Sequence, residues 1–176
     1  DYTVAANITT DTLTFADGKT LLVGGNTITG DITNNGTVTL ATGGDITGTT
    51  TMALSTDVLN LHDTAIGIVA GSGTINSAQD LTTGATITGT NLNVTDNILT
   101  LGANVTATTT TITAGATLDA ATGDDVIDGA VVNNGTLALD ANEVTGIITG
   151  TGVITMANDY TVAANITTDT LTFADG

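Results

Sequence analysis

The residues that usually carry out acid–base or nucleophilic chemistry are scarce in this sequence. His62 is the only histidine, Lys19 is the only basic residue, and cysteine is absent. A polysaccharide lyase needs arginine or lysine to bind acidic sugars, and a glycosidase needs two converging carboxylates, usually beside aromatic platforms. Residues 1–158 offer only Tyr2 and Phe15 as aromatic side chains. We therefore predict a protein that is not an enzyme, with no catalytic and no cofactor-binding residues.

The charge of the chain is strongly one-sided. It contains 18 acidic residues and one basic residue, which gives a net charge of −17. Nucleic acids and anionic membrane surfaces bind proteins through lysine and arginine, so this charge excludes both as partners. It favours a highly soluble extracellular polymer or a protein that binds cations. No run of about 18 apolar residues is present, so no membrane span is expected in this segment.

One segment of the chain is duplicated. Residues 1–18, DYTVAANITTDTLTFADG, recur without change as residues 159–176, so that the two copies are 158 residues apart. Self-similarity at a fixed period is typical of repeat proteins. We interpret residues 1–158 as one complete repeat unit and residues 159–176 as the start of the next identical unit. On this interpretation the chain is a window on a longer tandem array.

A shorter pattern lies within this unit. Threonine is the most abundant residue, and proline and tryptophan are absent. Threonine and the β-branched apolar residues favour strands over helices. Three stretches, residues 28–40, 127–139 and 144–156, align without gaps. They alternate apolar and polar residues at period two, with glycine and asparagine where the chain must turn.

The alternating pattern predicts an all-β fold, namely a parallel β-solenoid or β-helix. Following one apolar pair along the chain gives about eight rungs of about 20 residues in each 158-residue unit, with a right-handed coil as the default. A string of β-sandwich domains is the rival fold, but it would be richer in proline and bulky aromatic residues. The predicted inward-facing core residues are Leu13, Phe15, Val38, Leu40, Leu59, Leu61, Ile75, Leu99, Leu101, Leu118, Leu137, Leu139, Ile154 and Met156.

Two of the stretches, GDITNNGTVTL at residues 30–40 and GAVVNNGTLAL at residues 129–139, resemble the turns of bacterial β-helical surface proteins. The most similar families are autotransporter passengers and filamentous-haemagglutinin-like adhesins. The resemblance implies a long stalk or fibre outside the cell, at the bacterial surface. The expected partners are flanking copies of the same unit, in a covalent array or by end-to-end stacking, and lateral bundling of rods stays open.

A further stretch, TGDDVIDG at residues 122–129, resembles one copy of the Gly- and Asp-rich calcium turn of RTX proteins. In that family carboxylates and backbone carbonyls of stacked turns supply the oxygen ligands that calcium prefers. The resemblance implies Asp124, Asp125 and Asp128 as calcium ligands. The family motif runs in tandem, whereas the core GDDVIDG occurs once here, and solvated acidic residues at a corner are the alternative. No other cofactor is expected.

These features lead to one main hypothesis and two alternatives. The main hypothesis is a structural segment of a giant tandem-repeat extracellular fibre, stalk or adhesin shaft. The first alternative is a filament subunit that stacks end to end without covalent continuity. The second is a solenoid that binds calcium, a glycan or ice. On the strand used to count the rungs, only the pairs Thr12/Thr14 and Thr37/Thr39 fit the repeated Thr-x-Thr of an ice-binding face, so such a face would have to lie on another strand.

Overall fold

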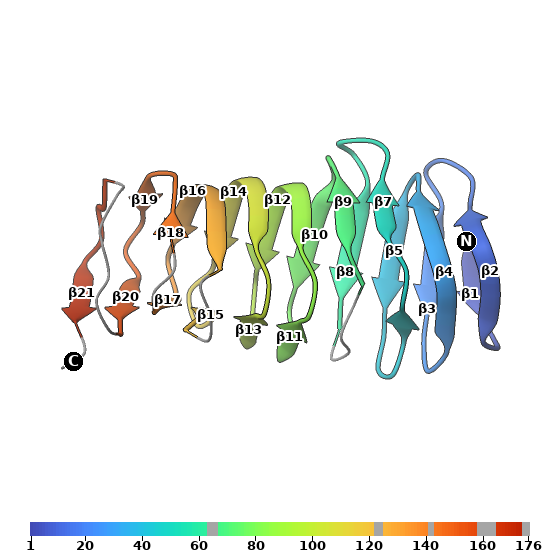
Figure 1. Ribbon diagram of the computed structural model, residues 1–176, viewed down its shortest axis with the longest axis horizontal. Coiled ribbons are helices and arrows are strands. Elements are labelled where there is room, and N and C mark those ends of the chain that lie inside the picture. Colours follow the sequence, from blue (N-terminus) through green and yellow to red (C-terminus); the bar gives the residue numbers. More distant parts are fainter. Residues whose placement is uncertain (63–66, 122–124, 141–142, 158–164, 174–176) are drawn as a thin grey trace.

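The computed structural model describes residues 1–62, 67–121, 125–140, 143–157 and 165–173, and contains no helix in these ranges. The chain winds into a parallel β-solenoid of about 9 turns with about 18 residues in each turn, which confirms the predicted fold class. Figure 1 shows the turns side by side along one axis, with β1 and β2 at one end and β21 at the other. No helix in the described ranges could cross a membrane.

The strands stack in three columns, each named here after one of its residues. The Tyr2 column contains Tyr2, Leu21, Val38, Leu59, Ile75, Leu92, Thr110, Val131, Ile148 and Ile166, each paired in register with the next. It is formed by β1 (Tyr2–Val4), β3 (Thr20–Val23), β5 (Thr37–Leu40), β8 (Val58–Leu61), β10 (Thr74–Ser77), the second halves of β12 (Ile87–Val94), β14 (Val105–Ile112) and β16 (Val126–Asn133), and β19 (Ile148–Thr149).

The Leu13 column comes one corner earlier in each turn. It contains Leu13, Ile32, Thr50, Val69, Ile87, Val105, Ile127 and Val144. It is formed by β2 (Ile8–Thr14), β4 (Thr27–Asn34), β7 (Thr50–Met52), β9 (Val69–Gly71), the first halves of β12, β14 and β16, and β18 (Glu143–Val144).

The Leu99 column closes the turn. Leu81, Leu99, Leu118, Leu137, Ile154 and Leu171 pair in succession, and they form a separate six-stranded sheet. The sheet consists of β11 (Leu81–Thr83), β13 (Ile98–Leu101), β15 (Thr117–Ala120), β17 (Thr136–Leu139), β20 (Val153–Met156) and β21 (Thr170–Phe173). In the early turns the position between the Tyr2 column and the Leu13 column is taken by Ile8, Ile28 and Ile46, which pair in succession. Ile46 lies on β6 (Asp45–Ile46).

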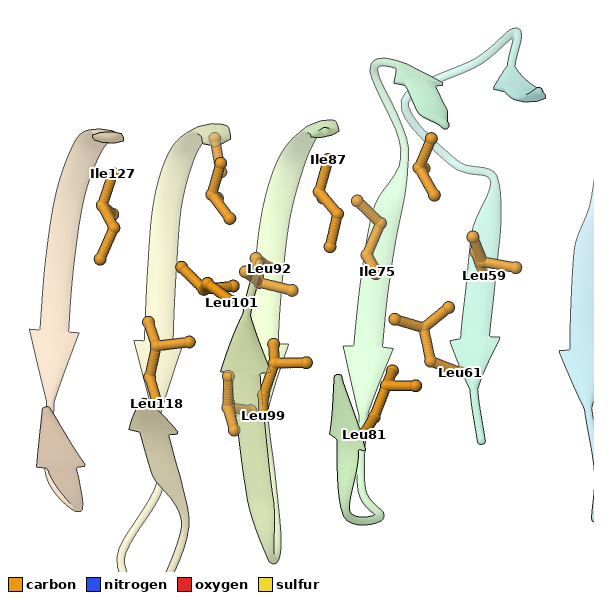
Figure 2. Packing of buried hydrophobic residues seen from close by; sticks show 14 of the residues in the cluster. Leu59, Leu61, Ile75, Leu81, Ile87, Leu92, Leu99, Leu101, Leu118 and Ile127 are labelled. Carbon is orange, nitrogen blue, oxygen red and sulfur yellow. The ribbon is translucent and has the colours of Figure 1, made fainter. Parts of the chain in front are cut away.

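The core lies between the three columns and runs along the axis. In β5, β8, β10, β15 and β17 the first and third residues are half-buried and the second and fourth are buried, which is the alternation expected of strands with one face inward. Figure 2 shows Leu59, Ile75, Leu92 and Leu99 pointing into the space between the strands. Of the core residues predicted from the sequence, all are buried except Leu13, which is partly buried on β2.

The alignment that suggested rungs of about 20 residues joined different columns. Leu13 pairs with Ile32, and the partner of Val38 is Leu21. Ile75 likewise pairs with Leu92 and not with Leu99. The error has a physical cause, because all three columns carry the same apolar-x-apolar pattern and nothing in that pattern marks the column. Two of the steps therefore covered more than one turn, and the true turn is shorter, at about 18 residues.

Candidate functional site

The predicted cation ligands are only partly brought together. Asp124 lies outside the described residues. Asp125 is half-buried directly before β16, and Asp128 is exposed on β16. The Thr145 hydroxyl, one turn along, donates a hydrogen bond to Asp128 Oδ1 over 2.5 Å, and the Gly129 N–H donates to Thr145 Oγ1 over 3.2 Å. In the described ranges no group of three His, Cys, Asp or Glu side chains could hold a metal ion.

His62 and Lys19 occupy turns of the coil. His62 is half-buried and follows β8 directly, whereas the Lys19 side chain is exposed just before β3. The backbone of Lys19 is part of the ladder, since its carbonyl accepts a hydrogen bond from the Thr37 N–H over 2.9 Å. The fold keeps these two residues on separate turns, Lys19 ahead of β3 and His62 behind β8.

Several acidic and amide side chains at the corners connect one turn to the next. Asp31 Oδ1 accepts a hydrogen bond from the Thr49 N–H over 2.8 Å, and Asp80 Oδ1 accepts one from the Ile98 N–H over 3.0 Å. Each bond satisfies a backbone donor near the start of a strand, where the ladder has not yet begun. The same arrangement joins Asp1 to Thr20, Asn7 to Thr27 and Asn104 to Val126. These side chains therefore hold neighbouring turns together.

Two asparagines are fully buried at corners that share the same hydrogen-bond pattern. Asn34 Oδ1 accepts a hydrogen bond from the Gly36 N–H over 2.9 Å, and its Nδ2 donates to the Val58 carbonyl over 3.0 Å. Asn133 makes the same two bonds, to Gly135 over 3.1 Å and to Val153 over 2.9 Å. Both sides of each amide are satisfied, as a buried polar group requires. The repeated NNG in the sequence is the signal that marks these corners.

An amide ladder runs along the outer side of the Tyr2 column. Asn60 Nδ2 donates to Thr39 Oγ1 over 3.0 Å, Asn76 Nδ2 donates to Asn60 Oδ1 over 2.9 Å, and Asn93 Nδ2 donates to Asn76 Oδ1 over 2.9 Å. Stacked amides of this kind stabilise parallel in-register strands. Sequence reasoning missed the ladder, because it becomes visible only when the turns are aligned in the correct register.

A hollow lies at the end of the solenoid where β1 and β2 are found. It measures about 480 Å³ and is lined by residues 2–8, residues 13–16 and Leu21. In the described ranges β1 pairs only with β3, and β2 only with β4, so one edge of each strand is open. Tyr2 and Phe15 meet edge to face in this hollow, with their ring centroids 6.5 Å apart. The hollow therefore lies in line with the core between the columns.

No protein-family model, no curated protein and no solved structure matches this chain. The fold and the contacts between its turns therefore define its class, which is that of a parallel β-solenoid.

Proposed function

We propose that the chain is a structural segment of a tandem-repeat extracellular fibre, stalk or adhesin shaft at the bacterial cell surface, without enzymatic activity. One observation carries this proposal. The apolar core continues from turn to turn along all the described ranges, and the described part of the second copy extends the same ladders, since Ile148 pairs with Ile166 and Ile154 with Leu171. A stack in which each turn contacts only its neighbours can be lengthened by further copies of the same unit.

The polar groups support a mechanical role. Corner carboxylates and amides, the buried asparagines and the amide ladder all form hydrogen bonds between successive turns. Bonds in this direction strengthen the long axis of a rod. The net charge of −17 keeps such rods apart in solution and suits an extracellular polymer.

A second candidate function is binding to a flat hydrated surface such as ice or a glycan. It is favoured by two short runs of threonines on the outer side of the Leu13 column. Thr14, Thr33 and Thr51 form the first run, which ends at Ala70, and Thr88 and Thr106 form the second, which ends at Asp128. Regularly spaced hydroxyl groups on a rigid face can match an ordered lattice of water or sugar. Thermal hysteresis of the chain, lost when Thr51 and Thr88 are both replaced by lysine, would support binding to ice, and its absence from the unaltered chain would contradict binding to ice.

The fibre proposal is tested on the native protein from its source. We expect a polypeptide much larger than 17.3 kDa on denaturing mass measurement and rod-shaped particles on imaging. The rods should advance by about 4.8 Å per turn, which is the spacing of hydrogen-bonded strands. A native polypeptide of 17.3 kDa or a globular particle would contradict the proposal.

A further inference from the structure

The two identical segments have different neighbours. In the first copy Ile8 pairs with Ile28 and Leu13 pairs with Ile32, so both partners come later in the chain. In the second copy Ile166 and Leu171, which correspond to Ile8 and Leu13, pair with Ile148 and Ile154, which come earlier in the chain. The first copy thus contacts the turn that follows the duplicated segment in the chain, and the second copy contacts the turn that precedes the duplicated segment.

The second copy therefore identifies the strands that fit the open edge of the first. The Ile148 N–H donates to the Asn165 carbonyl over 2.9 Å, and the Thr167 N–H donates to the Ile148 carbonyl over 2.9 Å. Further along, β20 pairs in register with β21, with Met156 opposite Phe173. Asn7, Ile8, Thr9 and Phe15 are the matching residues of the first copy, and they offer the same groups beside the hollow at the end of the core.

We propose that this open end is the docking surface for residues 147–156 of a preceding copy of the same repeat unit. Ile148 would pair with Ile8, Ile154 with Leu13, and Met156 with Phe15, as they do with the second copy here. The occupant is apolar on its inner side, since Ile148, Ile154 and Met156 are all buried. The inference rests on the proposed function, because it requires a further copy of the unit.

This docking rotates each unit relative to the one before. Leu13 belongs to the Leu13 column, which reaches Val144 seven turns later. From Val144 the chain passes Ile148 in the Tyr2 column after one-third of a turn and Ile154 in the Leu99 column after two-thirds. Leu171 follows Ile154 in the Leu99 column, so it lies one and two-thirds turns beyond Val144. One unit of 158 residues therefore makes eight and two-thirds turns. Identical side chains of successive units face directions one-third of a turn apart, and three units restore the original direction.

The backbone shows how the corner is passed. Ile148 and Ile154 are six residues apart, and their partners Ile166 and Leu171 are five residues apart. Ile8 and Leu13, which correspond to Ile166 and Leu171, pair in turn with Ile28 and Ile32, which are four residues apart. The corner that contains Gly150, with φ of 121°, is thus matched two turns later by a shorter corner inside the continuous strand β4, where Gly30 has φ of 134°. At about 4.8 Å per turn the unit rises about 42 Å, and three units rise about 125 Å.

The junction can be tested in the 176-residue chain, which has no native cysteine. Thr155 and Thr172 are paired Cα partners across the junction, and Thr14 and Thr33 are paired partners between the first copy and the turn that follows it. Paired parallel strands place Cα atoms about 4.8 Å apart, within the range of a disulfide. We expect the double variants T155C/T172C and T14C/T33C to cross-link within one molecule on mild oxidation, as seen by mass spectrometry of peptides.

The double variant T145C/T172C is the comparison. If the unit made eight whole turns, Thr172 would follow Thr145 in the Leu13 column and this pair would cross-link instead. Cross-linking of T145C/T172C, or failure of T155C/T172C while T14C/T33C succeeds, would overturn the inference. A native polypeptide of 17.3 kDa would contradict the fibre proposal but leave the cross-link at residues 155 and 172 unchanged, so the two failures are distinguishable.

Discussion

Asn34 and Asn133 form the same corner motif with the same two hydrogen bonds, but they stand at different corners of the coil, and the strands that come after them belong to different columns. Asn34 leads into β5 of the Tyr2 column, and Asn133 leads into β17 of the Leu99 column. The corner motif is therefore independent of the column in which it stands. A chain with interchangeable corners can repeat its sequence after a number of turns that is not whole, as the two copies of residues 1–18 do.

Replacement of Gly129 by alanine should destabilise the solenoid severely. Gly129 has a φ of 117°, and a Cβ atom there would collide with the Ala107 carbonyl of the preceding turn. Backbone strain and overpacking together should lower the free energy of unfolding by at least about 3 kcal/mol. The matched control is Gly84→Ala, where a Cβ atom meets nothing within 4 Å and the change should stay below about 1 kcal/mol. Urea unfolding measures the free energy of unfolding of both variants. Equal losses in the two variants would contradict the close approach of Gly129 to the preceding turn.

Replacement of Thr110 by valine should stabilise the chain. Thr110 is buried in the Tyr2 column between Leu92 and Val131, and its hydroxyl has no hydrogen-bond partner among the described residues. Removing an unsatisfied buried hydroxyl while keeping the shape of the side chain should raise the free energy of unfolding by about 1 kcal/mol. The same substitution at Thr83, whose hydroxyl accepts a bond from the Gly102 N–H over 3.4 Å, should lower it. Thermal unfolding would show opposite shifts, and a loss of stability in T110V would refute the prediction.

Replacement of Asn76 by alanine should weaken the amide ladder. The Asn76 amide donates to Asn60 and accepts from Asn93, so its removal leaves two neighbouring amides without their partner. We expect a loss of about 2 kcal/mol in the free energy of unfolding. Thr82→Ala, at an exposed position on β11, is the control and should change stability by less than about 0.5 kcal/mol. A loss in N76A no larger than that of the control would mean that the ladder contributes nothing.

Added salt should stabilise the solenoid. With a net charge of −17 the folded chain repels itself, and raising NaCl from about 0.01 to about 1 M shortens the Debye length from about 30 to about 3 Å. The melting temperature should therefore rise with NaCl concentration. Millimolar CaCl₂ provides a second comparison, because a rise beyond that of NaCl at equal ionic strength, reversed by a chelator, would indicate a calcium site. Abolition of that extra rise in D128N would locate the site at the predicted turn.

The fold class could be predicted from the sequence because alternation at period two and Gly- or Asn-rich turns are local signals. The column to which each strand belongs could not be predicted from the sequence, because it depends on contacts with residues one turn away. Val38 and Leu13 carry the same local pattern but pair with Leu21 and Ile32 in different columns. The amide ladder was missed for the same reason, since Asn60 and Asn76 gain their meaning only from stacking. The three acidic residues of the predicted calcium turn were found by resemblance, and their joint geometry includes Asp124, which lies outside the described residues.

The direction of the chain within each turn determines how such a rod would respond to a pull. The backbone path lies across the axis, and the hydrogen bonds of the ladders lie along it. Tension along the axis therefore opens the bonds between neighbouring turns one turn at a time. Each turn that opens replaces about 4.8 Å of rod by about 60 Å of extended chain. A shaft of this construction would lengthen more than tenfold, turn by turn, before any covalent bond is strained.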